Sequence, residues 1–315
     1  MSPAFAVDSR KRGCLRRRMP RVAKQDGSFW LNSAEKKGMA ACRARKKSFV
    51  TMQTTPINRC SLPPWAIASR HYNRAPQPLE IQGGLDNSRP LFAKLDGVDD
   101  PEQRGLLFHD FMDVRYQLHQ WQQQTTQTSR KSLKNSYLRF LRGWLFDSNS
   151  LEGAVLKGWV ESRLGLPPTF HHEPISDMQS PAYGRYLVER MRGSQRTSAI
   201  YCQFDLLYQF VQYETGRRSP DQTHVTLFRG IHDFAEHQIV EQLAKQRLVL
   251  RLNCLNSFTD DFERAWEFGS RVLKTDVPLT KIFFLGGLLP KALFKGEGEV
   301  MVIGGEFEVE VLTGG

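Results

Sequence analysis

Several features that mark well-known classes of protein are absent from this sequence. Its five cysteines include no C-x-x-C pair and are odd in number, which argues against a disulfide framework and indicates inert thiols in a reducing compartment. No apolar run reaches the ~18 residues that a membrane-spanning helix needs, and the first residues lack the apolar stretch of a secretory signal. We therefore expect a cytoplasmic protein without a membrane span.

Glycine-based nucleotide motifs and metal-binding spacings are absent as well. Gly286-Gly287 and Gly296-Glu297-Gly298 follow expected strands, but neither opens a helix with the spacing G-x-G-x-x-G, and no Walker sequence occurs. This argues against a Rossmann domain. His171-His172-Glu173 and His109-Asp110 lack the companion spacing of a zinc site, so we expect no metal ion.

A charge excess is present, but it is confined to one end of the chain. The net charge is +11 at pH 7, and residues 1–50 hold 14 Lys and Arg against 3 Asp and Glu. The other 265 residues hold 30 side chains of each sign. A body with balanced charge has no general attraction for phosphate polymers, so we expect no nucleic acid partner for it.

The basic segment, residues 1–55, has little apolar periodicity, and Gly, Ser and Pro interrupt it. It is typical of a solvated, disordered tail. A contact with nucleic acid or anionic lipid is a second interpretation. A third is that translation begins at Met39 or Met52, so that most of the tail is an artefact of the assigned start.

Helical patterns dominate residues 56–220. A helix is expected from Pro101, capped by Asp99 or Asp100, with a buried stripe at positions of helical spacing: Leu107, Phe111, Val114, Leu118 and Trp121. Further helices are expected over four ranges: 131–146, 151–164, 182–192 and 199–214. The second of the five helices would bury Tyr137, Phe140, Leu141 and Trp144 together with Leu133.

Residues 221–315 favour strands. The sequence predicts strands at 225–228, 248–250, 277–284, 299–303 and 307–312, with Gly304-Gly305 as a hairpin turn between the last two. Helices are predicted at 232–246 and 262–268. Helices first and strands second indicate an α+β fold, in which 56–220 and 221–315 together form one domain.

Four polar residues of the strand-rich segment form an ordered set. Arg229 follows one predicted strand, Ser257 closes another, and Glu297 and Glu299 begin a third. Alternation along a strand would place both carboxylates on one face, about 6–7 Å apart, where they repel each other unless a cation or a reaction uses them. Taken singly, each residue has an ordinary explanation: a solvent-facing stripe, a salt-bridge partner or a helix cap. Glu306, Glu308 and Glu310 are expected to be such a stripe.

The order Arg, Ser, Glu-x-Glu resembles that of the arginine-directed ADP-ribosyltransferases. Longer segments are similar to the bacterial dinitrogenase-reductase ADP-ribosyltransferases, namely residues 62–70, 130–137, 146–159 and 256–269. The likeness runs from about Ile57 to the C-terminus. It implies a helical N-terminal half packed on a split β-sandwich of ADP-ribosyltransferase type, which binds NAD+ as a substrate.

The resemblance also implies a role for each residue. Arg229 would contact a phosphate or ribose of NAD+, because a guanidinium suits bidentate anion recognition. Ser257 would hold the catalytic carboxylate, and Glu299 would stabilise the sugar cation formed as nicotinamide leaves. Gly230, Phe258 and Thr259 would complete the NAD+ site. The family often has Ser-Thr-Ser where this chain has Ser257-Phe258-Thr259, so the middle position departs from the pattern.

Glu297 would accept a proton from the incoming arginine. A guanidinium has a pKa above ~12, so its neutral form at pH 7 costs on the order of 7 kcal/mol. Attack on a preformed cation avoids that cost, since the proton then leaves during or after attack. Two acids on one strand face also argue against a standard glycosidase, whose carboxyls bracket the scissile bond.

The resemblance implies a bacterial, cytoplasmic enzyme that modifies an arginine of dinitrogenase reductase and thereby inactivates it. It further implies control by a PII-type signalling protein. Two alternatives remain open: an NAD glycohydrolase or arginine ADP-ribosyltransferase with another protein target, and a catalytically inactive NAD-binding module. His71, Asp147 and Asn149 lie in family-like segments and are further candidates for the lining of the site.

Overall fold

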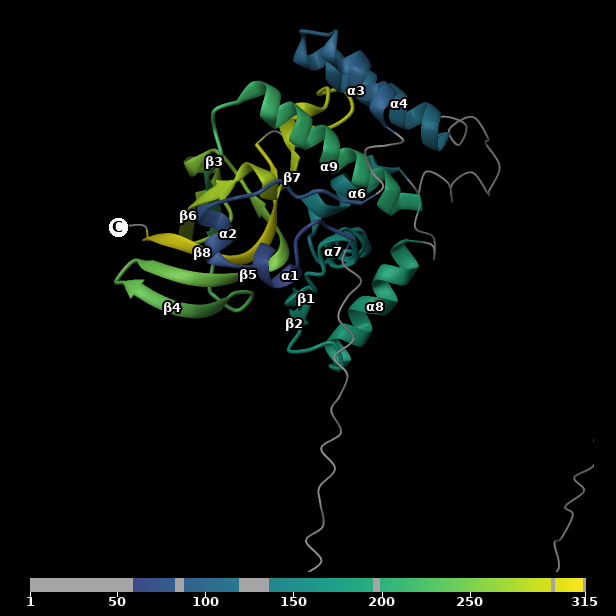
Figure 1. Cartoon of the computed structure of the whole chain (residues 1–315). Helices are drawn as coiled ribbons and strands as arrows, with labels where there is room; N and C mark the ends of the chain where they lie inside the picture. Colours follow the sequence, from purple (N-terminus) through teal and green to yellow (C-terminus); the bar gives the residue numbers. More distant parts are fainter. Residues whose placement is uncertain (1–58, 83–87, 119–135, 195–198, 296–297, 314–315) are drawn as a thin grey trace, which may run out of the picture. The chain divides into compact units, whose positions relative to one another are not determined.

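The computed structural model describes residues 59–82, 88–118, 136–194, 199–295 and 298–313 (Figure 1). By its internal contacts the chain divides into Met1–Met52 and Gln53–Gly315, and every described residue belongs to the second unit. The predicted tail, residues 1–55, thus lies outside the described residues. None of the described helices is long and apolar enough to cross a membrane.

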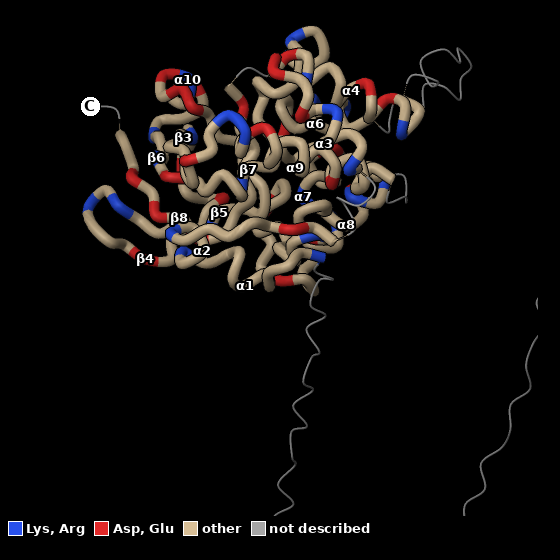
Figure 2. Tube along the Cα trace, turned by 45° about the horizontal axis from the view of Figure 1, so that its top comes forward, with Lys and Arg blue, Asp and Glu red and all other residues tan. Residues whose placement is uncertain are grey.

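Charged residues of both signs are distributed along the described chain. Figure 2 shows Lys and Arg interspersed with Asp and Glu over both helices and strands. This distribution agrees with the even charge balance counted in the sequence after residue 50.

Helices come first along the chain, as predicted. They are α1 Pro64–Ile67, α2 Arg70–Arg74, α3 Arg89–Asp96, α4 Pro101–Tyr116, α6 Tyr137–Phe146, α7 Leu151–Leu164, α8 Pro181–Gly193 and α9 Ala199–Arg218. The predicted bounds of α7 are confirmed, because Ser150 caps it by accepting a hydrogen bond from the Gly153 amide at 3.1 Å. The part of the predicted 131–146 helix before residue 136 lies outside the described residues.

The buried face of α4 differs from the prediction. Leu107 and Val114 are exposed, and the helix instead buries Arg104, Gly105, Phe108 and Met112. The prediction is confirmed for Leu118, which is buried, and Phe111 packs partly buried against the core. It is wrong for Leu107 and Val114, because two of the four buried positions of the helix are not apolar. Trp121, the last residue of the predicted stripe, is outside the described residues.

The strands form mainly one antiparallel sheet. Its members are β3 His224–Ile231, β4 Gln238–Ala244, β5 Arg247–Phe258, β6 Arg271–Pro278, β7 Ile282–Leu285 and β8 Val300–Thr313. The order is β3-β6-β8-β5-β4, and β7 pairs with β8. A short helix, α10 Phe262–Trp266, follows β5, and a two-stranded hairpin, β1 Phe170–His171 with β2 Glu173–Pro174, lies between α7 and α8. The α+β class is confirmed.

The long strand β8 changes partners along its length. Val300–Val302 lie between β5 and β7, whereas the last residues, from Glu310 on, pair with β6. The register of β5 shifts between Leu252 and Leu255 where this change occurs. Where the resemblance implied a split β-sandwich, these described strands form one six-stranded sheet in which β8 changes partners.

The predicted hairpin at Gly304-Gly305 is wrong, because both glycines lie inside β8. A Cβ at Gly304 would lie 1.7 Å from the Asn253 carbonyl oxygen, and Gly305 has φ +125° with the Ala68 backbone against it. These glycines permit close approach of neighbouring backbone segments rather than a turn.

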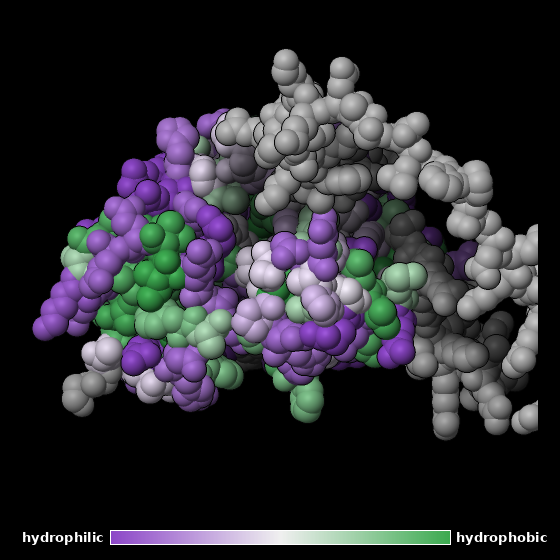
Figure 3. Space-filling model, turned by 90° about the horizontal axis from the view of Figure 1, so that it is seen from below, coloured by the Kyte–Doolittle hydropathy of each residue, from purple (hydrophilic) through white to green (hydrophobic). Residues whose placement is uncertain are grey.

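The predicted helix at 232–246 is also wrong. Residues 238–244 form β4, which pairs with β5 at the edge of the sheet. Ile239, Val240 and Leu243 fit a helical spacing in sequence, but all seven residues of β4 are exposed. Figure 3 shows a hydrophobic patch with a hydrophilic border on the side where Figure 1 places β4. Backbone pairing with β5, not burial, holds this strand.

Aromatic side chains join the helices to the sheet. Trp159 of α7 and Phe204 of α9 contact Phe283 of β7, with ring centroids 4.7 and 5.9 Å apart, and all three are fully buried. Each such ring contributes about 1.5–3 kcal/mol when buried. The two halves of the described chain therefore share one hydrophobic core.

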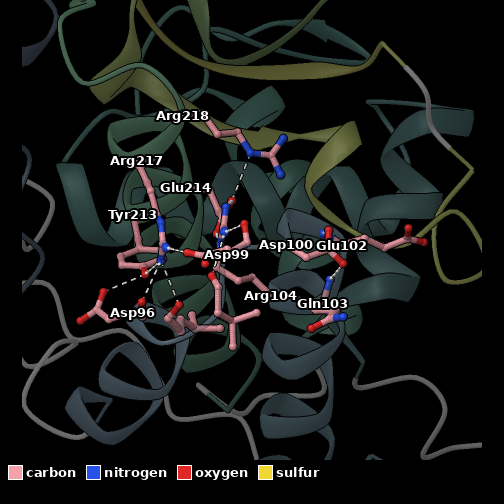
Figure 4. A network of polar contacts seen from close by, with 12 residues as sticks. Asp96, Asp99, Asp100, Glu102, Gln103, Arg104, Tyr213, Glu214, Arg217 and Arg218 are labelled. Carbon is pink, nitrogen blue, oxygen red and sulfur yellow. Dashed lines mark hydrogen bonds and ion pairs between the residues drawn. The ribbon is translucent and has the colours of Figure 1, made fainter.

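A buried ion pair joins α4 to α9 (Figure 4). Arg104 meets Glu214 through two parallel hydrogen bonds, Nε to Oε1 at 2.6 Å and Nη2 to Oε2 at 2.9 Å. The same guanidinium donates to the carbonyls of Val98 and Asp99. The Arg104 and Glu214 side chains are 3% and 0% exposed. We call this pair the α4–α9 clamp.

Candidate active site

The sheet brings Arg229, Ser257 and Glu299 to one place. Phe228 of β3 and Thr259 exchange two backbone hydrogen bonds of 2.8 Å. This bridge brings the backbone at Arg229, the next residue after Phe228, close to the backbone at Ser257, two residues before Thr259. Ser257 pairs with Met301 of β8, two residues after Glu299. The predicted strand at 225–228 extends to Ile231, so Arg229 lies within β3 rather than after it. We call these three residues the Arg229–Ser257–Glu299 group.

A tryptophan from the helical half completes this group. The indole Nε1 of Trp144, in α6, donates to Ser257 Oγ at 2.8 Å and to Glu299 Oε1 at 3.3 Å. Trp144 is 2% exposed, so its ring excludes water from one side of the carboxylate. The sequence predicted that Trp144 is buried, but it gave no sign that the indole reaches the acid.

Arg229 is held on two sides. Its Nη1 donates to the Ser257 carbonyl at 2.9 Å, and its Nη2 lies 3.3 Å from Glu236 Oε2. Its Nε is buried and has no hydrogen-bond partner among the described residues. Burial lowers the pKa of Arg229, against the opposing influence of Glu236 and Glu299. A guanidinium with an unused N–H donor can donate a hydrogen bond to a further anionic or polar group.

Glu299 carries a perturbed carboxyl group. Burial raises its pKa, while hydrogen bonds from Ser257 and Trp144 and the charge of Arg229 lower it. Burial is the largest of these influences. A desolvated carboxylate interacts more strongly with a cation than one in water, because the local dielectric is low.

Lys157 lies behind Trp144 and was missed in the sequence analysis. It is 1% exposed, donates to Asn149 Oδ1 at 3.1 Å and to the Phe170 carbonyl at 3.0 Å, and stands 6.0 Å from the centroid of the Trp144 ring. Burial lowers the pKa of Lys157 to about 8. The signal in the sequence was a lysine with no charged residue beside it, between Ala154-Val155-Leu156 and Gly158-Trp159-Val160 of a predicted helix.

The remaining predicted site residues have various locations. Gly230 packs against α10, where a Cβ would lie 2.0 Å from the Ala265 carbonyl oxygen. Phe258 belongs to the hydrophobic core and is 3% exposed. Thr259 accepts a hydrogen bond from the Asp261 amide at 3.1 Å. Glu297 lies outside the described residues.

The backbone conformation of Gly298 contradicts the strand alternation that we predicted for Glu297 and Glu299. It has φ +76°, in the left-handed region, and β8 begins only at Val300. A Cβ at Gly298 would lie 2.4 Å from Arg264 Nη1. The expectation that Glu297 and Glu299 share a face assumed an extended backbone, which does not continue through Gly298.

The three glutamates later in β8 lie away from this group. Glu306, Glu308 and Glu310 line a separate cavity of about 580 Å³. Arg251 pairs with Glu306 at 2.9 Å, and Lys274 lies 3.7 Å from Glu310. These glutamates are partly buried and ion-paired rather than a freely solvated stripe.

Comparison with known proteins identifies the family. The family model described as dinitrogenase reductase ADP-ribosyltransferase matches residues 57–311. The chain is 40% identical, over 257 residues, to a Rhodospirillum rubrum protein named NAD(+)--dinitrogen-reductase ADP-D-ribosyltransferase; the match covers 80% of this chain and 93% of that protein. No solved structure matches. This chain therefore belongs to the dinitrogenase reductase ADP-ribosyltransferase family.

Proposed function

We propose that this chain transfers ADP-ribose from NAD+ to an arginine of dinitrogenase reductase, inactivating that protein and releasing nicotinamide. The observation that carries the proposal is the convergence of Arg229, Ser257 and Glu299, in which Arg229 bonds to the Ser257 carbonyl and the Trp144 indole bonds to Ser257 and Glu299. The name of the Rhodospirillum rubrum relative supports NAD+ and dinitrogen reductase as the two substrates. The choice of arginine is our inference from the Glu-x-Glu sequence at 297–299.

Arg229 and its neighbours would hold the dinucleotide. The unpartnered Nε of Arg229 lies in a buried environment, where a phosphate or ribose oxygen would satisfy it. Gly230, Phe258 and Thr259 flank this group along β3 and the end of β5. We assign them to the NAD+ site as backbone and packing support.

Glu299 would stabilise the developing cation. As the bond between ribose C1′ and the nicotinamide nitrogen breaks, its electron pair leaves with neutral nicotinamide and the ribose becomes an oxocarbenium ion. The desolvated carboxylate of Glu299, held by Ser257 and Trp144, is suited to that charge. The same carboxylate can accept a hydrogen bond from the adjacent ribose hydroxyl.

Glu297 would then receive a proton. An arginine nitrogen attacks C1′, a C–N bond forms, and the nitrogen loses one proton to the Glu297 carboxylate. This order avoids a neutral guanidine in water, which costs on the order of 7 kcal/mol at pH 7.

We infer that the enzyme acts in the cytoplasm of a nitrogen-fixing bacterium, under the control of a PII-type signalling protein. The organism of the relative supports the first inference. The second comes from the family resemblance alone, and co-purification of the full chain with such a protein tests it.

The proposal is tested by incubating the protein with labelled NAD+ and dinitrogenase reductase. Label on an arginine of the target supports it. Free ADP-ribose without labelled protein would instead indicate an NAD glycohydrolase, and unchanged NAD+ would indicate a binding module.

The Glu297→Gln variant separates the roles of the two acids. We expect it to retain slow NAD+ cleavage to water while its transfer to arginine falls by about 10²-fold or more. Glu310→Gln, at the far end of β8, is the matched control. Transfer at the normal rate in Glu297→Gln would contradict the assigned role.

A further inference from the structure

Two consecutive histidines and a glutamate meet on the surface beside α7. His171 and His172 belong to the β1–β2 hairpin, and Glu189 lies in α8. Glu189 Oε2 is 2.9 Å from His171 Nε2 and 3.4 Å from His172 Nε2, and the three atoms lie within 4.8 Å of one another. Glu173, the residue next to these histidines in sequence, takes no part and instead pairs with Arg185.

The backbone takes an unusual conformation to bring the two rings together. Side chains of consecutive residues in an extended strand point to opposite faces. His172 has φ +59°, in the left-handed region, so its ring turns to the side of His171, and the ring centroids are 4.7 Å apart. A residue other than glycine adopts this conformation at a cost of about 1–2 kcal/mol.

His172 is the single residue between the paired positions His171 and Glu173, so the hairpin turn sets this conformation and also places the ring beside that of His171. The side chain of His172 is 54% exposed and Glu189 is 30% exposed. An ion pair between exposed groups is worth only about 0–1 kcal/mol. His171 differs, because it is buried and its hydrogen bond to Glu189 is sufficient reason for its position.

We propose that His171, His172 and Glu189 bind one divalent transition-metal ion of the zinc class. With metal–nitrogen and metal–oxygen bonds of about 2.0–2.2 Å, the separations of Glu189 Oε2 from the two histidine nitrogens, 2.9 and 3.4 Å, give angles at the ion of about 85–110°. The two nitrogens must lie within about 4.4 Å of each other to share the ion, and the exposed His172 ring can turn to meet this limit. Two imidazoles and one carboxylate favour Zn²⁺, Co²⁺ or Fe²⁺ over Mg²⁺ and Ca²⁺. Because His172 and Glu189 are partly exposed, the ion has access from solvent and keeps an open coordination position.

The proposed ion would be connected to the Arg229–Ser257–Glu299 group through Lys157. His171 Nδ1 lies 3.3 Å from Lys157 Nζ, and Lys157 stands over the Trp144 ring.

The experiment is equilibrium dialysis of the metal-stripped full chain against Zn²⁺ and Co²⁺, with the visible spectrum of Co²⁺ as a direct report on its ligands. We expect one ion per chain. His172→Ala and Glu189→Gln should each weaken binding by about tenfold or more, and both replace side chains that are at least partly exposed. A control variant, His232→Ala with Glu267→Gln, changes exposed residues elsewhere and should bind as the wild type does.

Two results would overturn the metal site: no ion bound by the wild type, or equal binding by the His172→Ala/Glu189→Gln double variant. The Glu299→Gln variant should bind the ion normally. The metal site therefore stands or fails separately from the transferase activity.

Discussion

The α4–α9 clamp and the Arg229–Ser257–Glu299 group each contain an arginine and a glutamate, fully buried in the clamp and partly buried in the group, and the two arrangements differ. In the clamp, Arg104 and Glu214 face each other through two hydrogen bonds, and hydrogen bonding to Glu214 raises the pKa of Arg104. In the group, Arg229 leaves Nε unpartnered, and burial raises the pKa of Glu299. A satisfied pair stabilises the fold, whereas an unsatisfied one keeps capacity for a ligand.

The strongest test of this comparison removes the charge of Glu299, the proposed catalytic acid. We expect Glu299→Gln to lower nicotinamide release by about 10³-fold, because an amide cannot stabilise the ribosyl cation as a carboxylate does. Turnover of NAD+ with the folded variant measures this. The stability of Glu299→Gln should match or exceed that of the wild type, since a desolvated charge is lost. Near-normal turnover would exclude Glu299 from the chemistry.

The corresponding change in the clamp should affect folding instead. Arg104→Met leaves the Glu214 carboxylate buried without its main partner, and we expect the free energy of unfolding to fall by about 3 kcal/mol. Denaturant unfolding measures it. The double variant Arg104→Met/Glu214→Leu should recover most of the loss, because apolar side chains replace both charges. Failure to recover would mean that the Val98 and Asp99 contacts dominate.

Lys281 is a buried cation whose hydrogen-bond partner is a backbone carbonyl oxygen rather than a carboxylate. It is 0% exposed, donates to the Gly304 oxygen at 3.1 Å, and burial lowers its pKa to about 7 from 10.5. Between these values the unfolded chain binds more protons than the folded one, so stability rises with pH over that window. We expect a gain on the order of 3 kcal/mol between about pH 7 and 10, measured by unfolding at several pH values. Lys281→Met should remove this slope.

The mildest test concerns the indole hydrogen bond. Trp144→Phe removes the donor to Ser257 and Glu299, and since that bond lowers the pKa of Glu299, the pKa should rise further. The acid limb of the pH–rate profile should then move to higher pH, so that the rate at a pH on this limb falls by about tenfold. Trp159→Phe, a core change in α7, is the control. An unmoved acid limb would show that Trp144 only fills space.

Local patterns predicted the helices well. The predicted bounds of α7 and the predicted burial of Tyr137, Phe140, Leu141 and Trp144 in α6 are confirmed, because each depends on neighbours along one helix. The strands were harder to predict. The spacing of Ile239, Val240 and Leu243 fits a helix as well as a strand, and only pairing with β5 decides between them.

The site shows the same distinction. Arg229, Ser257 and Glu299 were chosen from their order in the sequence, and the sheet brings them together. The contact of Trp144 with Glu299 joins residues that are 155 positions apart, so no local sequence pattern predicts it. Glu236 was assigned to a helix and instead lies beside Arg229 in the segment before β4.

The contact between Trp144 and Glu299 also bears on which fragment of the chain could work alone. A truncated protein that begins near residue 221 would keep β3 to β8, yet it would lack the indole donor from α6 and the aromatic cover that α7 and α9 place on β7. The smallest active fragment therefore includes the helices from α6 onward. Any excised strand-rich piece would expose its sheet to water and to self-association.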